Sequence, residues 1–488
     1  MSNREPYVHE RSKRGIKCRV PAGGLVAALD PVMRMTGGTW IAWGSGSADM
    51  ETSGPEGRIQ VPVEDPRYTL RRIWLTTKEV ADYYYGFSNR VIWPVCHMFQ
   101  ENALFEKEYW ETYKKVNAKF AAAAVEELEH DGRLWIQDIH YCLVPRLVRE
   151  ERPEVSIALF WHVPFPAVET FACIPWRKEL IMGLLGCDLI GFHSSAYVNN
   201  FLSTVKRELP EAVVTSSAVE LNGRVTRAKS FPLGIDYEAY SSRGRDERLR
   251  KRAARMRKRM DIPHVIFAVD RLDYTKGILN RFLAFERFLE SNPKFVGKVS
   301  FIQVASPTRE VISEYREMKR QVEETVGRVN GRFQQPNWTP IIYMNRFVPQ
   351  EELMAYYIMA DVAMITPVID GMNLVAKEYI TLNDQGVLIL SEFAGASEEM
   401  NAALIVNPYD VEMSARAILK ALTMTTEERE RNVHALRKVV KEHDLYWWLD
   451  TFLSEWGIEL SSRDWNKGPP SGPSCPLPQR ALVGPPPS

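Results

Sequence analysis

The second half of the chain alternates short apolar runs with longer helix-patterned stretches, and this alternation constrains the fold more than any other feature. The runs are rich in β-branched residues and apolar throughout, which indicates strands buried on both faces. The pattern predicts a parallel sheet between two helix layers, a doubly wound α/β domain. The six expected strands are His264–Val269, Val299–Ala305, Pro340–Met344, Asp361–Thr366, Gly386–Leu390 and Ala403–Val406.

The first half repeats this pattern less regularly. An alanine-rich helix is expected over Asn117–Leu128, and the Pro- and Gly-containing segment Phe231–Asp236 has the composition of a hinge. A length of 488 residues suits two or three domains. We therefore expect two Rossmann-like domains. The strands expected in the first are Thr39–Trp43, Arg133–Ile136, Ile157–Val163 and Asp188–Phe192.

The expected domain boundaries follow from this division. Residues 1–232 form the first domain and residues 233–444 the second. Residues 445–462 contain apolar side chains at helical spacing, from Leu445 to Trp456, which predicts a helix that packs on the core. Residues 466–488 contain eight prolines and three glycines, so this tail is expected to be disordered.

Charge gives no argument for a nucleic-acid partner. The 62 basic residues balance the 62 acidic ones, so no single-sign field is expected. The stretch Arg243–Met260 is strongly basic, but no base-reading motif accompanies it. A solvated surface helix is the simpler interpretation.

The chain has the features of a protein of the reducing cytoplasm. No apolar run approaches the roughly 18 residues of a membrane span. The first residues, Met1 to Glu5, lack the apolar core of a secretory signal. The six cysteines are scattered without a CxxC pair, which disfavours a disulfide scaffold. We expect a cytoplasmic protein with no membrane partner.

The common catalytic motifs are absent from the sequence. It has no phosphate-binding P-loop, no HExxH zinc helix, no GxSxG nucleophile elbow and no calcium-binding EF-hand loop. Gly44-Ser45-Gly46 lacks the third glycine of a dinucleotide motif, and His140, His162 and His193 are not spaced as metal ligands. We expect no metal and no cofactor in the chemistry.

Two cations follow the first strand of the second domain. Arg271 and Lys276 stand five residues apart in the string Val269–Gly277, at the carboxyl end of a strand, where ligands bind in open α/β sheets. A guanidinium and an ammonium can together hold a multiply charged anion. A solvated loop is the alternative interpretation.

A second anion site is predicted where a strand leads into a helix in Thr366–Tyr379. The free N–H groups at the helix start would meet a diphosphate, and Glu378 could accept hydrogen bonds from ribose hydroxyls. Alternatively, Asp370 is only an N-cap and Glu378 only a surface acid. The pair Gly23-Gly24 at another helix entry permits close approach of a ligand.

Five further residues suit a sugar phosphate, although each by itself is unremarkable. Arg309 follows the strand Val299–Ala305, at the same sheet edge as Arg271. The others lie in the first domain. The full set is Arg4, Tyr84, Trp93, Asp138 and Arg309.

These strings together resemble the trehalose-6-phosphate synthase family of retaining glycosyltransferases. The similarity runs from Ser2 to about Trp448, and its most specific part is the string Asp370–Tyr379. The resemblance implies the GT-B fold, with two facing Rossmann-like domains and a cleft between them. Its other segments are Gly23–Leu25, Phe87–Pro94, Trp135–Asp138, His162–Pro166, Arg271–Gly277 and Asn330–Phe333.

The resemblance implies transfer of glucose from a nucleotide-glucose, with UDP-glucose the expected donor, to glucose 6-phosphate. Arg271 and Lys276 would neutralise the leaving diphosphate, while His162 and Asp370 would address the transferred glucose. These four would be the catalytic residues. The donor site would contain Gly23, Gly24, Arg271, Lys276, Val348, Asp370, Leu374, Val375, Ala376, Lys377 and Glu378.

The acceptor residues would be the five named above, with Arg4, Tyr84 and Arg309 on the phosphate and Trp93 shaping the pocket. In this family the usual proposal is substitution on one face of the sugar. The departing phosphate oxygen takes the acceptor proton, so no protein nucleophile is needed. Preorganised donors aimed at the leaving group supply the largest catalytic effect.

The sequence departs from the family pattern at three places. Gln137 stands where a histidine is common, and Ile369 where an arginine is common. The second change is expected to weaken donor-phosphate binding or alter donor preference. The apolar strand that usually precedes Ser2-Asn3-Arg4 is missing, so we expect a natural start upstream or a shortened chain.

Two alternatives remain open at this stage. A glucosylglycerol-phosphate synthase would use glycerol 3-phosphate as the acceptor. A catalytically silent sugar-phosphate sensor is disfavoured because Arg271, Lys276, Asp370 and Glu378 are all present. The expected partners are the small-molecule substrates, a separate phosphatase acting on the product, and other copies of the chain in a homo-oligomer.

Overall fold

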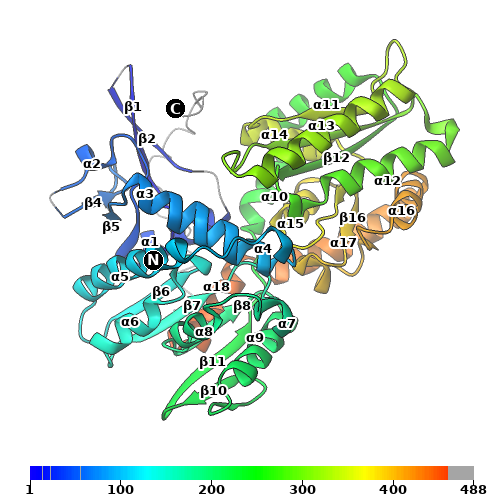
Figure 1. Ribbon diagram of the computed structural model, residues 1–488. Helices are drawn as coiled ribbons and strands as arrows, with labels where there is room; N and C mark the ends of the chain where they lie inside the picture. The colour runs from blue at the N-terminus through cyan, green and yellow to red at the C-terminus, as the bar shows by residue number, and fades with distance from the viewer. Residues whose placement is uncertain (14, 22–23, 55, 460–488) are drawn as a thin grey trace.

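The computed structural model describes residues 1–13, 15–21, 24–54 and 56–459. The predicted tail at 466–488 and the predicted donor residue Gly23 lie outside these ranges. The chain forms two lobes that lie side by side, the first coloured blue to green and the second green to orange (Figure 1). Each lobe is built around its own sheet.

The N-terminal lobe has a six-stranded and a three-stranded sheet. The larger has the order β6-β7-β8-β11-β10-β9, in which β6, β7, β8 and β11 are parallel, and the smaller has the order β3-β5-β4. A separate hairpin pairs β1 with β2. The strands are β1 Val8–Ser12, β2 Gly15–Arg19, β3 Thr39–Trp43, β4 Arg58–Val61, β5 Tyr68–Ile73, β6 Arg133–Gln137, β7 Ser156–Phe160, β8 Leu189–Phe192, β9 Val213–Val214, β10 Ala218–Leu221 and β11 Arg224–Ser230.

The helix with the most unusual geometry in this lobe is η1, a π-helical stretch that continues α3 and leads into α4. The helix predicted over 117–128 is the second half of the longer α5. The helices of the lobe are α1 Gly24–Thr36, α2 Asp49–Thr52, α3 Thr77–Glu79, η1 Val80–Ile92, α4 Trp93–Cys96, η2 Gln100–Asn102, α5 Lys107–Glu127, η3 Ile139–Tyr141, α6 Val144–Glu151, α7 Val168–Phe171, α8 Arg177–Leu184 and α9 Ser195–Glu208.

The first four residues lie between the two sheets of this lobe. The amide of Ser2 donates to Ile41 of β3, and the carbonyl of Met1 accepts from Gln137 of β6, each at 3.0 Å. Arg4 forms a parallel bridge with Trp43. Met1–Arg4 therefore lie beside the carboxyl ends of β3 and β6, and they bring Arg4 to the carboxyl edge of both sheets.

The C-terminal lobe confirms the predicted fold class most directly. Its sheet has the order β14-β13-β12-β15-β16-β17 with every pairing parallel, which is the 3-2-1-4-5-6 order of a Rossmann fold. All six predicted strands are present within a residue or two. They are β12 His264–Arg271, β13 Val299–Ser306, β14 Ile341–Met344, β15 Val362–Ile365, β16 Val387–Ser391 and β17 Leu404–Val406.

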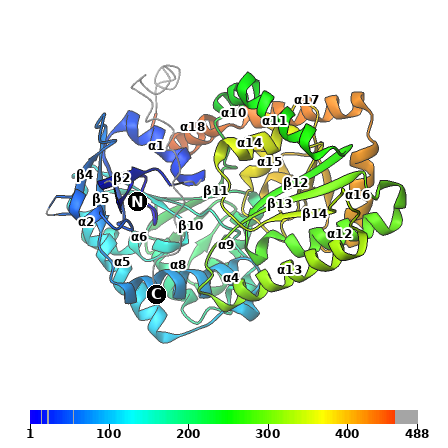
Figure 2. The same ribbon diagram turned by 90° about the horizontal axis from the view of Figure 1, so that it is seen from above.

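Helices cover both faces of this sheet (Figure 2). The basic stretch forms the end of α10 and all of α11, because Asp246 interrupts the helix and caps α11 with its carboxylate. The helices are α10 Tyr237–Arg245, α11 Glu247–Met260, η4 Tyr274–Lys276, α12 Ile278–Ser291, η5 Pro293–Phe295, α13 Ser313–Phe333, α14 Gln350–Met359, α15 Leu374–Leu382, η6 Gly395–Glu398, α16 Val411–Thr423, α17 Thr426–Glu442 and α18 Leu445–Glu455.

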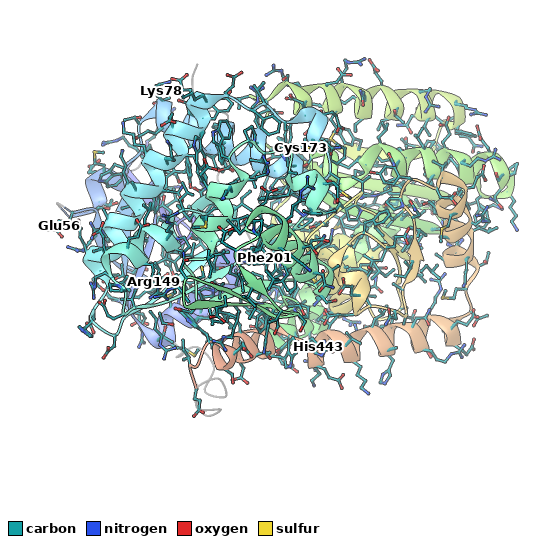
Figure 3. The ribbon with its side chains drawn as sticks, turned by 60° about the horizontal axis from the view of Figure 1, so that its bottom comes forward. Glu56, Lys78, Arg149, Cys173, Phe201 and His443 are labelled. Carbon is teal, nitrogen blue, oxygen red and sulfur yellow. The ribbon has the colours of Figure 1, made fainter. Side chains whose placement is uncertain are left out.

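The chain crosses between the lobes twice. It first crosses through the irregular segment 231–236, and it returns after α17, where His443 precedes α18 (Figure 3). The apolar face of α18 packs on the N-terminal lobe, with Phe452 stacked on Trp135 at 4.8 Å between ring centroids. The helix predicted to begin at Leu445 and to pack on the core is present, and it ends at Glu455. Among the described residues, no helix has the length and apolar character needed to cross a membrane.

Candidate active site at the junction of the lobes

The first predicted anion-binding string forms a tight loop after β12. Arg271 is the last residue of the strand, and the buried carboxylate of Asp273 accepts from the backbone and hydroxyl of Thr275 at 3.1 and 3.0 Å. Gly277 then begins α12 with a φ of +65°, where a Cβ would lie 2.4 Å from the carbonyl oxygen of Thr366. The loop is thus fixed by its own side chains and by β15, and it is not a freely solvated loop.

Lys276 contacts the second predicted anion-binding segment, Thr366–Tyr379. Its ammonium lies 2.6 Å from the carboxylate of Asp370, and both side chains are largely buried. Burial would raise the pKa of Asp370, but the neighbouring Lys276 outweighs it and holds the pKa below its ordinary value. The Asp370 carboxylate thus holds the Lys276 side chain beside the start of α15.

The start of α15 is open toward this pair. Its N-cap is Asn373, in the left-handed region at φ +74°, and it makes no side-chain cap. The amide of Asn373 instead donates to Asp370 at 2.9 Å. Asp370 is therefore not the N-cap of α15. The first N–H groups of the helix, at the partly exposed Leu374 and Val375, remain available to an anion.

Glu378 is not a surface acid. Its two carboxylate oxygens accept from the hydroxyls of Tyr240 and Tyr357, at 2.9 and 3.1 Å. Burial raises its pKa, and these two hydrogen bonds oppose the rise. The residue keeps further lone pairs for a ligand hydroxyl.

The other predicted donor residues differ in how accessible they are. Ala376 is fully buried, and Val348 is buried in the loop between β14 and α14. The ammonium of Lys377 is also fully buried, where it donates to the carbonyl of Leu233 and to Glu399 at 2.9 and 2.8 Å. These contacts tie α15 to the connecting segment 231–236 and to Glu399 of the same lobe, so the ammonium of Lys377 is engaged within the protein.

Residues from the two lobes meet at Trp93. The guanidinium of Arg309 lies 4.2 Å from the centroid of the Trp93 ring, and that of Arg271 lies 5.2 Å away. Arg309 is held on its other side by Asp273 at 3.2 Å and by the Tyr315 hydroxyl at 2.6 Å. Two cations from the C-terminal lobe thus converge on an aromatic ring of the N-terminal lobe.

The pKa of Tyr84 shows that the electrostatic potential of this region is positive. Burial alone would raise the pKa of the Tyr84 hydroxyl, yet Arg309, Arg4 and Arg271 lower it below its ordinary value. Burial, Arg309 and Arg4 also lower the pKa of His140 to about 3, so this ring is neutral. A buried site that favours anions this strongly suits a phosphate.

Asp138 and His162 lie together on the N-terminal side. Asp138 has a φ of +71°, and its carboxylate accepts from the backbone N–H of His162 at 3.3 Å. Burial raises the pKa of Asp138 to about 6. The ring of His162 lies 2.9 Å from the Gln137 amide oxygen, and burial lowers the pKa of His162 well below its ordinary range.

The lobes approach each other closely at Gly371. A Cβ at this position would lie 2.3 Å from the carbonyl oxygen of His162. Beside the junction, a pocket of about 490 Å³ opens between η2 and the helices α12 and α13. The charges of Lys276 and Arg271 both act on Asp370, and Gly371 beside it meets the carbonyl of His162, so the four expected catalytic residues lie near one another at the junction.

Some site residues were not predicted from the sequence. Asp273 holds both arginines, Tyr315 holds Arg309, and the buried ring of His97 packs on Trp93 at 4.1 Å between centroids. Asp273 lies inside a string already singled out, and His97 lies one helical turn after Trp93. Tyr240, Tyr315 and Tyr357 have no local sequence signal, because the helices that carry them are distant in sequence from the carboxylates they contact.

Two Rossmann-like lobes with convergent cationic groups at their junction define a glycosyltransferase of the GT-B fold. The model of glycosyltransferase family 20 matches residues 1–457. The chain is 38% identical over 467 residues to the trehalose-6-phosphate synthase of Mycobacterium avium, a match that covers 93% of this chain and 94% of the relative.

Two further relatives extend the comparison. The chain is 38% identical to the bifunctional trehalose-6-phosphate synthase/phosphatase of Thermoproteus tenax; this match covers 93% of the chain but only 62% of that longer relative. It superimposes with a TM-score of 0.83, at 33% identity, on a UDP-forming α,α-trehalose-phosphate synthase from Burkholderia xenovorans in complex with glucose-6-phosphate. That match covers 90% of this chain and 97% of the other. The chain belongs to glycosyltransferase family 20 and to its trehalose-6-phosphate synthases.

Proposed function

We propose that this enzyme transfers glucose from UDP-glucose to glucose 6-phosphate, giving α,α-trehalose 6-phosphate and UDP. The observation that carries the proposal is the meeting of two cationic sites at one junction: Arg309 and Arg4 around Tyr84, and Lys276 beside the open start of α15. A phosphorylated acceptor and a diphosphate leaving group would each need one such site. The names of the relatives support this pair of substrates.

The chain's own residues suit the two halves of the reaction. Arg271, Lys276 and the first N–H groups of α15 would take up the charge that develops on the departing diphosphate. Lys276 would exchange its contact with Asp370 for the phosphate, which frees the Asp370 carboxylate to accept from a glucose hydroxyl. His162, neutral because of its burial, would contact the same glucose.

The proposed chemistry needs no nucleophile from the protein. The bond from the anomeric carbon to the diphosphate breaks while the acceptor oxygen bonds to the same face. The proton of the acceptor hydroxyl passes to the departing phosphate oxygen. The tight junction at Gly371 would exclude water, which otherwise competes as the acceptor.

A substrate panel tests this proposal. The full chain is incubated with UDP-, GDP- or ADP-glucose and with glucose 6-phosphate or glycerol 3-phosphate, and the released nucleotide is measured. We expect turnover with UDP-glucose and glucose 6-phosphate, and an α,α-linked product in the NMR spectrum. Turnover with glycerol 3-phosphate alone would contradict the proposal.

Three lesser proposals accompany the main one. Cationic side chains and helix amides are sufficient to neutralise the diphosphate, so activity should survive chelation of divalent metals. A separate phosphatase would hydrolyse the product, an activity that the Thermoproteus tenax relative joins to the synthase in its name. The substrates are cytoplasmic metabolites, so the protein would act in the cytoplasm.

A further inference from the structure

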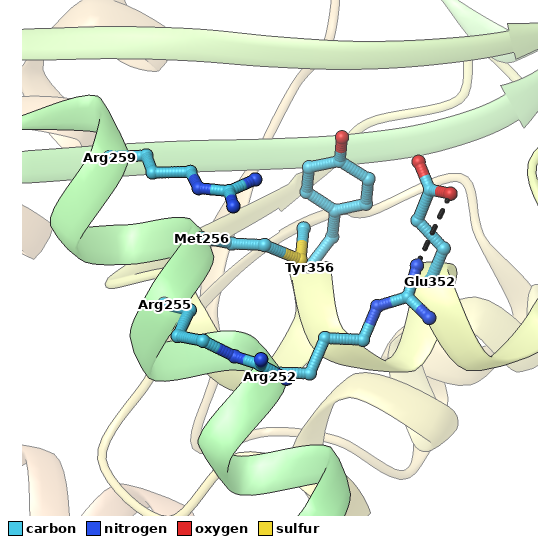
Figure 4. A pocket seen from close by; sticks show the side chains of 6 residues that line it. All are labelled: Arg252, Arg255, Met256, Arg259, Glu352 and Tyr356. Carbon is cyan, nitrogen blue, oxygen red and sulfur yellow. Dashed lines mark hydrogen bonds and ion pairs between the residues drawn. The ribbon is translucent and has the colours of Figure 1, made fainter.

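A second cationic pocket lies away from the junction, between α11 and α14 of the C-terminal lobe (Figure 4). Its volume is about 420 Å³, within the range of small-molecule sites. No residue of the proposed active site contributes to it. Its walls are Arg252, Arg255, Met256, Arg259, Glu352 and Tyr356.

The arrangement of the arginines follows from the geometry of α11. Arg252, Arg255 and Arg259 recur at intervals of three and four residues, so they share one face of the helix. Arg255 and Arg259 are one turn apart, which spaces their guanidiniums for neighbouring phosphoryl groups. This face borders the groove between α11 and α14, where Arg255 and Arg259 are exposed to solvent and Arg252 is half-buried.

Charge pairing among the described residues leaves two arginines without an acidic partner in this pocket. Away from it, Arg250 pairs with Asp384, Lys251 with Glu247 and Arg257 with Asp361. Within the described part of the chain, no acidic side chain pairs with Arg255 or Arg259. Arg248 and Lys258, outside the pocket, likewise form no ion pair with a described acidic residue. The pocket is therefore marked by the grouping of two unneutralised guanidiniums, and not by the lack of pairing alone.

The single acidic wall residue does not cancel this charge. Glu352 lies 3.4 Å from Arg252 and 3.1 Å from Arg346, so two guanidiniums already share its carboxylate. The pocket therefore has a net positive charge that an anionic ligand would balance.

The remaining walls are apolar and suit a planar group. Met256 and the guanidinium of Arg259 point toward the ring of Tyr356 (Figure 4). That ring is fixed from behind by Phe267, which is stacked on it at 5.3 Å with only 7° between the planes. A thioether and a rigid aromatic ring form a surface against which a flat heterocycle packs well.

From these features we infer that the pocket binds a nucleotide, with its phosphate chain on Arg255 and Arg259 and its base against Met256 and Tyr356. The site is separate from the proposed donor site at α15. Its occupant is therefore a ligand additional to the two substrates.

Equilibrium dialysis with labelled ATP tests this inference, using the full chain without added UDP, because UDP would compete for a nucleotide pocket. The double variant Arg255→Ala/Arg259→Ala is compared with Arg248→Ala/Lys258→Ala, which removes the same charge from exposed positions of α11 outside the pocket. We expect ATP to bind the wild type and the control variant alike, and the pocket variant at least about tenfold more weakly. Glucose transfer is expected to be unchanged in both variants.

Three outcomes would overturn the inference. The first is no ATP binding to the wild type, and the second is equal weakening in the two double variants, which would show only general surface charge. The third is pyrophosphate binding as tightly as ATP, since the base would then contribute nothing. Because the readout is binding, a failure of the proposed transferase reaction would leave these outcomes unaffected.

Discussion

The donor and acceptor regions of this enzyme are built in opposite ways. Most of the predicted donor residues come from two short strings, 271–277 and 370–378, which follow the adjacent strands β12 and β15 of a single sheet. The acceptor region gathers Arg4, Tyr84, Trp93 and Asp138 from one lobe and Arg309 from the other. A site inside one sheet is fixed by local loops, whereas a site across two lobes depends on how the lobes meet.

This difference predicts separable effects on the two substrates. Changes in the donor strings should impair the chemical step, because the leaving group develops its charge there. Changes in the cross-lobe cluster should impair acceptor binding. The predictions below run from the largest expected effect to the smallest.

Lys276→Ala should lower kcat by about 100- to 1000-fold, because one preorganised charge on the leaving diphosphate is lost. Steady-state kinetics measures the effect, and circular dichroism shows whether the fold is kept. Lys258→Ala, at an exposed position of α11, serves as the control. A wild-type rate in Lys276→Ala would remove this lysine from the proposed mechanism.

Arg309→Ala should raise KM for glucose 6-phosphate by about 10- to 100-fold. This is the loss of binding expected when one hydrogen bond to a charged group is removed. KM for the donor should change by less than about twofold. Arg316→Ala, on the exposed face of α13, is the matched control. If both KM values rise together, the acceptor assignment of Arg309 is wrong.

Asp138 should make kcat/KM for the acceptor decrease at acidic pH. Burial raises its pKa to about 6, so below this pH the carboxyl is protonated and accepts hydrogen bonds poorly. We expect kcat/KM for the acceptor to fall several-fold from pH 7 to pH 5.

The phosphate of the acceptor titrates near pH 6 as well, so the variant Asp138→Asn is needed. In this variant, the fall in kcat/KM that comes from protonation of the substrate phosphate should remain. The fall that comes from protonation of Asp138 should disappear. The same carboxyl also affects stability: because the folded protein holds this proton more tightly than the unfolded chain, stability is gained below about pH 4 and lost as the pH rises through about 6. Identical pH profiles of wild type and variant would contradict the assignment.

Tyr240→Phe should have the smallest effect, raising the donor KM about 2- to 10-fold, because Glu378 loses one of the two hydroxyls that orient it. Tyr237→Phe on the same helix is the control. The acceptor KM should stay constant in both variants. No change in the Tyr240→Phe donor KM would show that Glu378 is positioned without this bond.

Prediction from the sequence succeeded for elements whose formation depends on neighbouring residues. The strands β12 to β17 are continuous apolar runs and were found almost to the residue. The first lobe was harder, because short strands such as β9 and the exposed β2 have no apolar run, and the π-helical η1 has no sequence signature of its own. The strand predicted to reach Val163 ends at Phe160, where the chain turns to place His162 beside Asp138.

For the site residues too, the sequence predicted what depends on neighbouring residues and missed what depends on contacts between distant ones. Arg271, Lys276 and Asp370 were predicted together because they follow strands of one sheet, and the structure joins two of them in an ion pair. Lys377 was predicted on the donor from its place in a string, but its side chain points to the hinge and Glu399. A position in a string does not give the direction of a side chain, because successive residues of a helix point to different sides.

The sequence by itself determined the class of fold, the family and the two donor strings, because hydrophobic periodicity and strand-end loops act over a few neighbouring residues. Only the tertiary structure decided that Arg271 and Arg309 share Trp93, that Tyr240 and Tyr357 hold Glu378, and that α11 turns unpaired arginines toward α14. These contacts join residues far apart in the chain. They exist because burial of the cores brings whole elements together, and no short-range pattern records which side chains then meet.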